Sequence, residues 1–180
     1  MKQAALHPNA GIVQKLFTAC LCALVLIGGN AIAAAPKHAQ PPMKIADTVV
    51  KLPLAKGVSM DDAVQSMKAR ANELNMKLVA ELPLSKQIVA MGETSRRIEI
   101  FQFCDPLTAK KMVEYDLHFA AYLPCRITLV EDAQGQAWLI MMNLDLFLGD
   151  PNLTPSLKSS AIQVRDTLNA IIKAGANGEI

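Results

Sequence analysis

Two cysteines, Cys104 and Cys125, flank a predicted helix in the stretch FQFCDPLTAKKMVEYDLHFAAYLPCRITLVED, residues 101–132. The other two cysteines, Cys20 and Cys22, lie in an apolar N-terminal run that is typical of an export signal. An exported protein with two remaining thiols is expected either to join them in a disulfide bond or to bury both. A bond that closes a loop of about 20 residues would stabilise the fold by roughly 3 kcal/mol.

The same two thiols are also candidates for redox chemistry or for binding a sulfur compound. Cys104 precedes a predicted helix N-terminus, whose partial positive charge favours a thiolate, whereas the neighbouring Asp105 opposes it. Arg126 follows Cys125 directly and favours a thiolate at that position. The sequence lacks the CxxC spacing of a dedicated disulfide-exchange enzyme, which counts against that class of enzyme.

A third interpretation of the two cysteines is a metal or haem site. Soft or borderline donor atoms are carried by two cysteines, one histidine and three methionines: Cys104, Cys125, His118, Met112, Met141 and Met142. No metal-ligand spacing is present, and methionines usually fill hydrophobic cores. The three interpretations stay open, and the sequence names neither a metal nor any other cofactor.

A strand is predicted over residues 96–104, ending at the first of the two cysteines. Ile98, Ile100 and Phe103 are expected on one side of this strand. Glu99 and Gln102 are expected on the other side. The alternation predicts that one side of the strand faces a hydrophobic core.

A helix follows this strand and fixes the position of the first cysteine. Asp105 is a suitable N-cap, Pro106 suits the first helical position, and the helix runs to about Tyr115. Cys104 is therefore expected at the junction between a strand and a connection. Irregular backbone at such junctions commonly carries functional sites.

The second cysteine begins another strand, predicted over residues 125–132. The preceding residues 116–124 are long enough to lead the chain back along the helix. A turn at 133–136 joins this strand to a hairpin partner at 137–147. We therefore expect both cysteines at the same end of the sheet, with sulfur atoms close enough to share a ligand or a bond.

The remaining elements complete an α+β domain. They are a strand at 48–55, a helix at 59–76, a strand at 77–84, a loop or lid at 85–95 and a C-terminal helix at 154–174. The order β-α-β-β-α-β-β-α predicts a largely antiparallel sheet with helices packed on one face. Pro53 is expected to place the first strand at an edge of the sheet, because proline cannot donate a backbone hydrogen bond.

Ten residues in and around the two-cysteine region form a pattern. Cys-Asp-Pro ends one strand, Leu-Pro-Cys-Arg starts the next, Glu-Asp ends it, and a glycine follows in the turn: Cys104, Asp105, Pro106, Leu123, Pro124, Cys125, Arg126, Glu131, Asp132 and Gly135. This pattern, over roughly residues 63–147, resembles the family catalogued as domain of unknown function 302. The resemblance implies a compact α+β fold, a homodimer and no established activity. This chain departs from it in its export signal and in Asp105, where the family commonly has asparagine; either residue can cap a helix.

One strand also predicts self-association from its own residues. The segment WLIMMNLDLF, residues 138–147, has apolar side chains at consecutive positions. Because successive side chains of a strand point to opposite faces, this pattern predicts cover on both faces of the sheet. Two-fold symmetry is the commonest geometry of a homo-oligomer. A homodimer is therefore the expected assembly.

The N-terminus predicts export. A basic leader, an apolar run and a small-residue end make residues 1–35 a signal peptide, with cleavage expected after Ala33. The alternative is an uncleaved membrane anchor, because the run is just long enough to span a bilayer. Residues 36–47 are expected to be a flexible linker, 48–175 a single domain and 176–180 a tail. The expected location is periplasmic or secreted, or membrane-anchored and facing the periplasm.

Charge and composition narrow the class of function. Without the two lysines of residues 1–35, 16 basic and 16 acidic residues remain, so the net charge falls from +2 to 0. A neutral domain lacks the basic excess that contacts to phosphate need, so a nucleic-acid partner is not expected. The sequence predicts an exported accessory module or a module that binds a small molecule around Cys104, Cys125, Asp105, Arg126 and His118. The alternatives are an enzyme of thiol redox or sulfur-compound chemistry, and a purely structural homodimer.

Overall fold

A computed structural model describes residues 43–179, so the predicted signal peptide lies outside the described residues. The described chain forms one five-stranded sheet in which all neighbouring strands are antiparallel. The strand order is β1-β5-β4-β3-β2. The strands are β1 (Val49–Pro53), β2 (Lys77–Leu82), β3 (Ile98–Cys104), β4 (Cys125–Glu131) and β5 (Ala137–Met142). The predicted α+β class and its antiparallel sheet are confirmed, and β1, which contains Pro53, lies at an edge.

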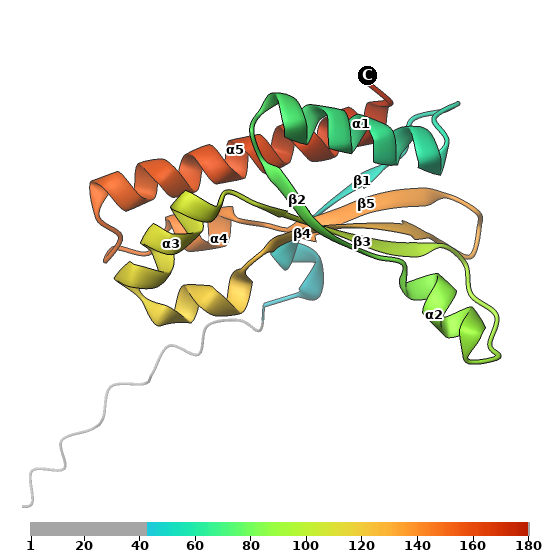
Figure 1. Cartoon of the computed structure of the whole chain (residues 1–180), viewed down its shortest axis with the longest axis horizontal. Coiled ribbons are helices and arrows are strands. Elements are labelled where there is room, and N and C mark those ends of the chain that lie inside the picture. The colour runs from blue at the N-terminus through green and yellow to red at the C-terminus, as the bar shows by residue number, and fades with distance from the viewer. Residues whose placement is uncertain (1–42, 180) are drawn as a thin grey trace, which may run out of the picture. The chain divides into compact units, whose positions relative to one another are not determined.

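Two long helices cover one face of the sheet (Figure 1). They are α1 (Met60–Glu73) and α5 (Pro155–Asn177), which lie side by side. Ser59 begins α1 with a capping box, since its hydroxyl accepts from the Asp62 amide while the Asp62 carboxylate accepts from the Ser59 amide. Thr154 is the N-cap of α5, and its hydroxyl accepts a hydrogen bond from the Leu157 amide. None of the described helices is both long and apolar enough to cross a membrane.

The hydrophobic core lies between these helices and the sheet. Five large side chains of the sheet are fully buried there: Phe101, Phe103, Ile127, Leu129 and Leu139. The predicted sides of β3 were therefore wrong in part. Phe101 and Phe103 face the helices, whereas Ile98 and Ile100 share the opposite face with Gln102, because side chains two residues apart lie on the same face. Ile98 and Phe103 are five residues apart and cannot share a face in a regular strand.

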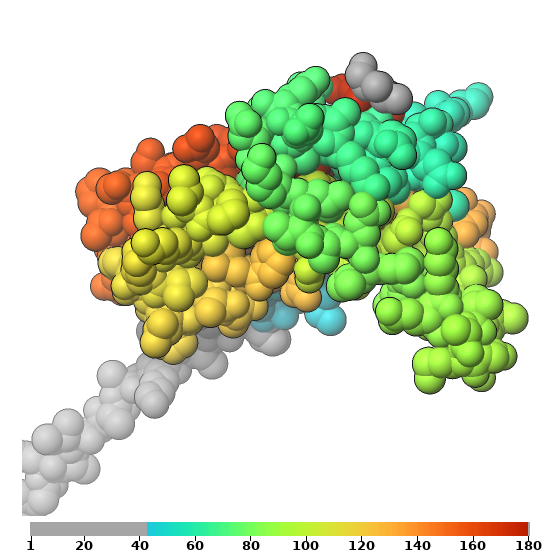
Figure 2. Space-filling view, in the orientation of Figure 1, coloured from blue at the N-terminus to red at the C-terminus, as the bar shows by residue number. Residues whose placement is uncertain are grey.

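The segment predicted as a loop or lid contains a short helix, α2 (Leu84–Ala90). Its residues include no glycine and no proline, and it ends before Gly92, which has a φ of +90°. A positive φ is easily adopted by glycine and stops the helix there. Helix α2 contacts β3 and stands clear of the rest of the molecule on the side of the sheet away from α1 and α5 (Figures 1 and 2).

Four further elements gather at the other end of the sheet or beneath it. They are α3 (Pro106–Tyr115), the 3-10 helix η2 (Leu117–Tyr122), the short helix α4 (Asp145–Leu148) and the 3-10 helix η1 (Ile45–Thr48). Helix α3 contacts both η2 and α5, and α4 contacts α5. These contacts build a cluster of helices beyond the ends of β3 and β5, and this cluster surrounds the two cysteines.

Candidate functional site

The two cysteines lie on neighbouring strands at one end of the sheet. Cys125 is the first residue of β4 and is paired with Phe103 of β3. Cys104 is the next residue of β3 and ends that strand. No disulfide joins the two residues, so both are free thiols.

Asp105 has a structural role at the start of α3. Its carboxylate accepts hydrogen bonds from the backbone amides of Leu107 and Thr108, at 3.1 and 3.3 Å, and from the Thr108 hydroxyl at 2.6 Å. These bonds, led by that of the Thr108 side chain, hold the pKa of Asp105 below its usual value. Asp105 therefore stays ionised as an N-cap and is not poised to transfer protons at neutral pH.

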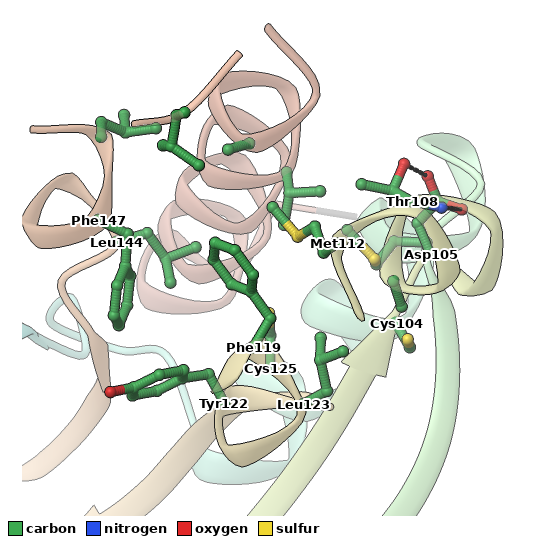
Figure 3. Close-up of a pocket in the computed structure, with 16 residues that line it drawn as sticks. Cys104, Asp105, Thr108, Met112, Phe119, Tyr122, Leu123, Cys125, Leu144 and Phe147 are labelled. Carbon is green, nitrogen blue, oxygen red and sulfur yellow. Dashed lines mark hydrogen bonds between the residues drawn. The ribbon is translucent and has the colours of Figure 1, made fainter. Parts of the chain in front are cut away.

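An apolar pocket, which we call the cysteine pocket, opens beside the two thiols (Figure 3). Four sulfur-bearing side chains line it: Cys104, Cys125, Met76 and Met112. Its wall is otherwise almost entirely carbon, and its cavity volume is about 60 Å³. Phe119 lies at the centre of the labelled side chains in Figure 3, with Tyr122 and Phe147 on one side and Asp105 and Thr108 on the other.

Both thiols are held in the neutral form. Burial raises the pKa of Cys125 to about 11, and the neighbouring Cys104 contributes to this rise. Burial also raises the pKa of Cys104, and the adjacent Asp105 carboxylate adds to the effect. Neutral thiols behave as small apolar groups and are poor nucleophiles.

Two other predicted site residues are placed elsewhere. Arg126 follows Cys125 in β4 and points to the opposite face of the sheet, so it does not line the cysteine pocket. The side chain of His118 is 94% exposed, and its Nδ1 atom lies 2.6 Å from an Asp116 carboxylate oxygen. The structure therefore brings together only three of the five predicted residues: Cys104, Cys125 and Asp105.

The proposed metal donors are also separated. Met112 lines the cysteine pocket, Met141 lies in the core, and Met142 lies on the opposite face of the sheet. Within residues 43–179, no group of three or more histidine, cysteine, aspartate or glutamate side chains is arranged to hold a metal ion. The described part of the chain therefore offers no preformed site of that kind.

A shallow groove continues from the pocket onto the face of the sheet away from α1 and α5. Tyr122, Cys125 and Leu144 line both the pocket and the groove. Arg126 and Ile140 line the groove but not the cysteine pocket. The cysteine pocket is therefore bordered by helices on one side and by an open sheet face on the other.

Several pocket residues were not predicted from the sequence. Phe119 and Tyr122 belong to η2, and the Tyr122 ring packs against Phe147 of α4 with centroids 4.5 Å apart. Met76 comes from the connection between α1 and β2. The two aromatic residues in the stretch LHFAAYLP were a usable signal, since large apolar side chains between the cysteines need burial. Met76 and Phe147 carry no local signal, because only the tertiary fold brings them to the cysteines.

The fold and the pocket together define a two-layer α+β domain with an apolar, thiol-lined pocket at one end of its sheet. The chain belongs to the DUF302 family, because the family model described as "Domain of unknown function DUF302" matches residues 50–175. No curated protein is similar enough to the chain to match it.

The chain is also similar to a solved crystal structure, that of an "uncharacterized conserved protein DUF302 from Bacillus stearothermophilus". That protein shares 17% sequence identity with this chain and superposes with a TM-score of 0.59. The match covers 71% of this chain and 97% of that chain. At this level of identity the similarity shows the shared fold alone.

Proposed function

We propose that this protein is an exported module that binds a small, uncharged, apolar ligand in the cysteine pocket. The observation that carries the proposal is the chemistry of the pocket wall, which is carbon and sulfur with almost no polar surface. Such a wall gives a polar or charged ligand little to pair with, and desolvation of that ligand would oppose binding. An apolar group gains free energy on entering it.

The size of the pocket limits the ligand to a slender group. A cavity of about 150 Å³ is enough to hold benzene, and the cysteine pocket has a cavity volume of about 60 Å³. A short alkyl chain, or the apolar end of a longer molecule, matches this space best. The raised pKa values of Cys104 and Cys125 weigh against the alternative of a thiol enzyme, which would need a thiolate.

Binding of linear alcohols, from propanol to octanol, tests this proposal by NMR titration of the backbone amides. Each added methylene should tighten binding about fourfold, which corresponds to about 0.8 kcal/mol, until the chain fills the pocket. Amide shifts should concentrate at Cys104, Met112 and Cys125. Ala109 also lines the pocket, so Ala109→Leu should fill it and abolish binding.

The matched control for this titration is Ala133→Leu in the exposed turn between β4 and β5, which should bind the alcohols like the unmodified protein. An affinity that does not depend on chain length would contradict the proposal, as would equal binding by both variants.

Export is proposed from the sequence of residues 1–35, in which a basic leader precedes an apolar run and a small-residue end. Cell fractionation followed by N-terminal sequencing should find the protein outside the cytoplasm, beginning near Ala34. Full-length protein in the membrane fraction would indicate that the N-terminal segment is not cleaved and anchors the protein in the membrane. Full-length protein recovered only from the cytoplasm would refute export.

A further inference from the structure

The shallow groove beside the cysteine pocket carries one ionised side chain. Among the described residues that line the groove, Arg126 is the only charged one, and no aspartate or glutamate is among them. Arg126 is exposed and forms no ion pair within residues 43–179. A guanidinium group holds its donors in a fixed fork that matches the two oxygens of a carboxylate. The groove therefore presents a cation that is available to an anionic ligand.

The rest of the groove surface is largely apolar. Pro124 and Ile140 line it, and neither is fully buried. Thr128 also lines the groove, on the same face as Arg126 and two residues further along β4, and adds a hydroxyl group. Gln102, which is paired with Arg126 on β3, is uncharged. An anion beside Arg126 would therefore meet hydrogen-bond donors and apolar surface, and no carboxylate of the groove wall would repel it.

The charges around the cysteine pocket give it a direction. The pocket joins the groove on the side of Tyr122, one of the side chains that line both. Asp105 lies on the other side of the pocket, across Phe119 (Figure 3). Its carboxylate is an ionised helix cap and repels an anion at that side. The anionic end of a ligand therefore belongs in the groove at Arg126, and its apolar end belongs in the pocket.

Cys125 lies between the two spaces and sets the length of such a ligand. It lines both the pocket and the groove, and Arg126 is the next residue of β4. Neighbouring side chains of a strand point to opposite faces, so a ligand that fills the pocket must pass Cys125 to reach Arg126. It therefore needs a longer chain than the pocket alone holds. The cavity volume of about 60 Å³ admits one slender chain, which disfavours a lipid with two acyl chains.

We propose that the cysteine pocket and the groove form one site for an alkyl carboxylate, with the alkyl chain in the pocket and the carboxylate at Arg126. This inference rests on the proposed function, which it extends from a small apolar ligand to a longer molecule. Only the apolar end of that molecule enters the pocket, so the pocket still holds an uncharged group. The carboxylate stays in the exposed groove and keeps part of its hydration, which avoids the desolvation cost of a buried charge.

NMR titrations with nonanoate, octanol and octylammonium, which carry the same octyl chain, test the head group. The unmodified protein should bind nonanoate about fivefold more tightly than octanol, as expected for an exposed ion pair. It should bind octylammonium more weakly than octanol. The Nε–H signal of Arg126 should shift with nonanoate but not with octanol. About 1 M NaCl should remove most of the preference for nonanoate, because salt screens exposed charges.

Arg126→Gln tests the residue that holds the carboxylate. This variant should bind nonanoate no more tightly than octanol, while its affinity for octanol stays unchanged. Arg96→Gln is the matched control, because Arg96 is also exposed, forms no ion pair within the described residues and does not line the groove. The control should keep the preference for nonanoate. Circular dichroism should show that both variants keep the fold.

The titrations separate failure of this inference from failure of the proposed function. Alcohol binding that depends on chain length, without any preference for nonanoate, overturns this inference and leaves the proposed function standing. A preference for nonanoate that Arg126→Gln retains, or that Arg96→Gln loses equally, also overturns it. Tightest binding of octylammonium overturns it too, because the head group would then lie at Asp105. Absence of binding by all three ligands refutes both proposals.

Discussion

A Gly175→Val substitution is expected to destabilise the fold by about 3 kcal/mol, at the upper end of the usual cost of overpacking a core. Gly175 lies on the buried side of α5, where that helix crosses α1 and the sheet. A Cβ atom at this position would lie 2.5 Å from Cγ of Met67 and 2.8 Å from Cδ1 of Leu139. It would also lie 3.2 Å from the backbone oxygen of Ala63, which cannot rotate away.

The clash should outweigh the intrinsic gain from replacing a glycine inside a helix, which is at most about 1 kcal/mol. Urea denaturation monitored by circular dichroism gives the free energy of unfolding of each variant. Gly149→Val is the matched control, because Gly149 has a negative φ and no neighbouring atom within 4 Å of an added Cβ. The control should change the free energy of unfolding by less than about 0.5 kcal/mol. Equal stability of the two variants would mean that α5 does not pack on α1 as closely as described.

Much of the fold was predictable because its signals are local. Ser59, Asp105 and Thr154 cap helices through side-chain hydrogen bonds to amides two or three residues away, so the starts of three helices follow from the sequence. Helix α2 was missed because its seven residues lack a polar cap and carry no strong periodicity. The sides of β3 were misassigned because both of its faces are apolar, and alternation alone cannot tell which of them the helices cover.

The sequence predicted the positions of site residues only where the course of the backbone determines them. The capped start of α3 and the return of the chain through η2 place Cys104 and Cys125 at one end of the sheet. Arg126 was expected to act on Cys125, but neighbours in a strand point to opposite faces. The thiol pKa values were not accessible from sequence, because they depend on burial by distant parts of the chain, such as Leu144 and Val164.

At pH 8, alkylation of Cys125 by iodoacetamide is expected to be about 100-fold slower than alkylation of an exposed cysteine with an ordinary pKa. The thiolate is the reacting form, and a rise in the pKa of Cys125 from 9.0 to about 11 lowers the thiolate fraction by about that factor. The rate should rise tenfold per pH unit and level off only near pH 11. Mass spectrometry of tryptic peptides follows Cys104 and Cys125 separately in the same unmodified chain, so no substitution is needed.

The same raised pKa makes stability depend on pH in a defined direction. The folded protein binds the proton of Cys125 more tightly than the unfolded chain does. The stabilisation that this proton gives the fold is therefore fully present below pH 9 and is lost as the pH rises toward 11. The free energy of unfolding should fall by up to about 3 kcal/mol across this window. Cys125→Ala removes the titrating group, and its unfolding free energy should fall less over the same pH range.

Alkylation rates and unfolding free energies together distinguish two interpretations of the cysteine pair, a thiol enzyme and an apolar binding pocket. A thiol enzyme needs a thiol with a lowered pKa. Cys125 would then react faster than an exposed cysteine at pH 8, and loss of its proton would stabilise the fold. A binding pocket needs a neutral wall, which slows alkylation and makes proton loss destabilising. An apolar ligand in the cysteine pocket should slow the alkylation of Cys125 further, because it would raise the cost of forming a charge beside it. Fast alkylation of Cys125 at neutral pH would show that the wall of the cysteine pocket is not neutral and apolar. It would thereby refute the proposal of a small, uncharged, apolar ligand.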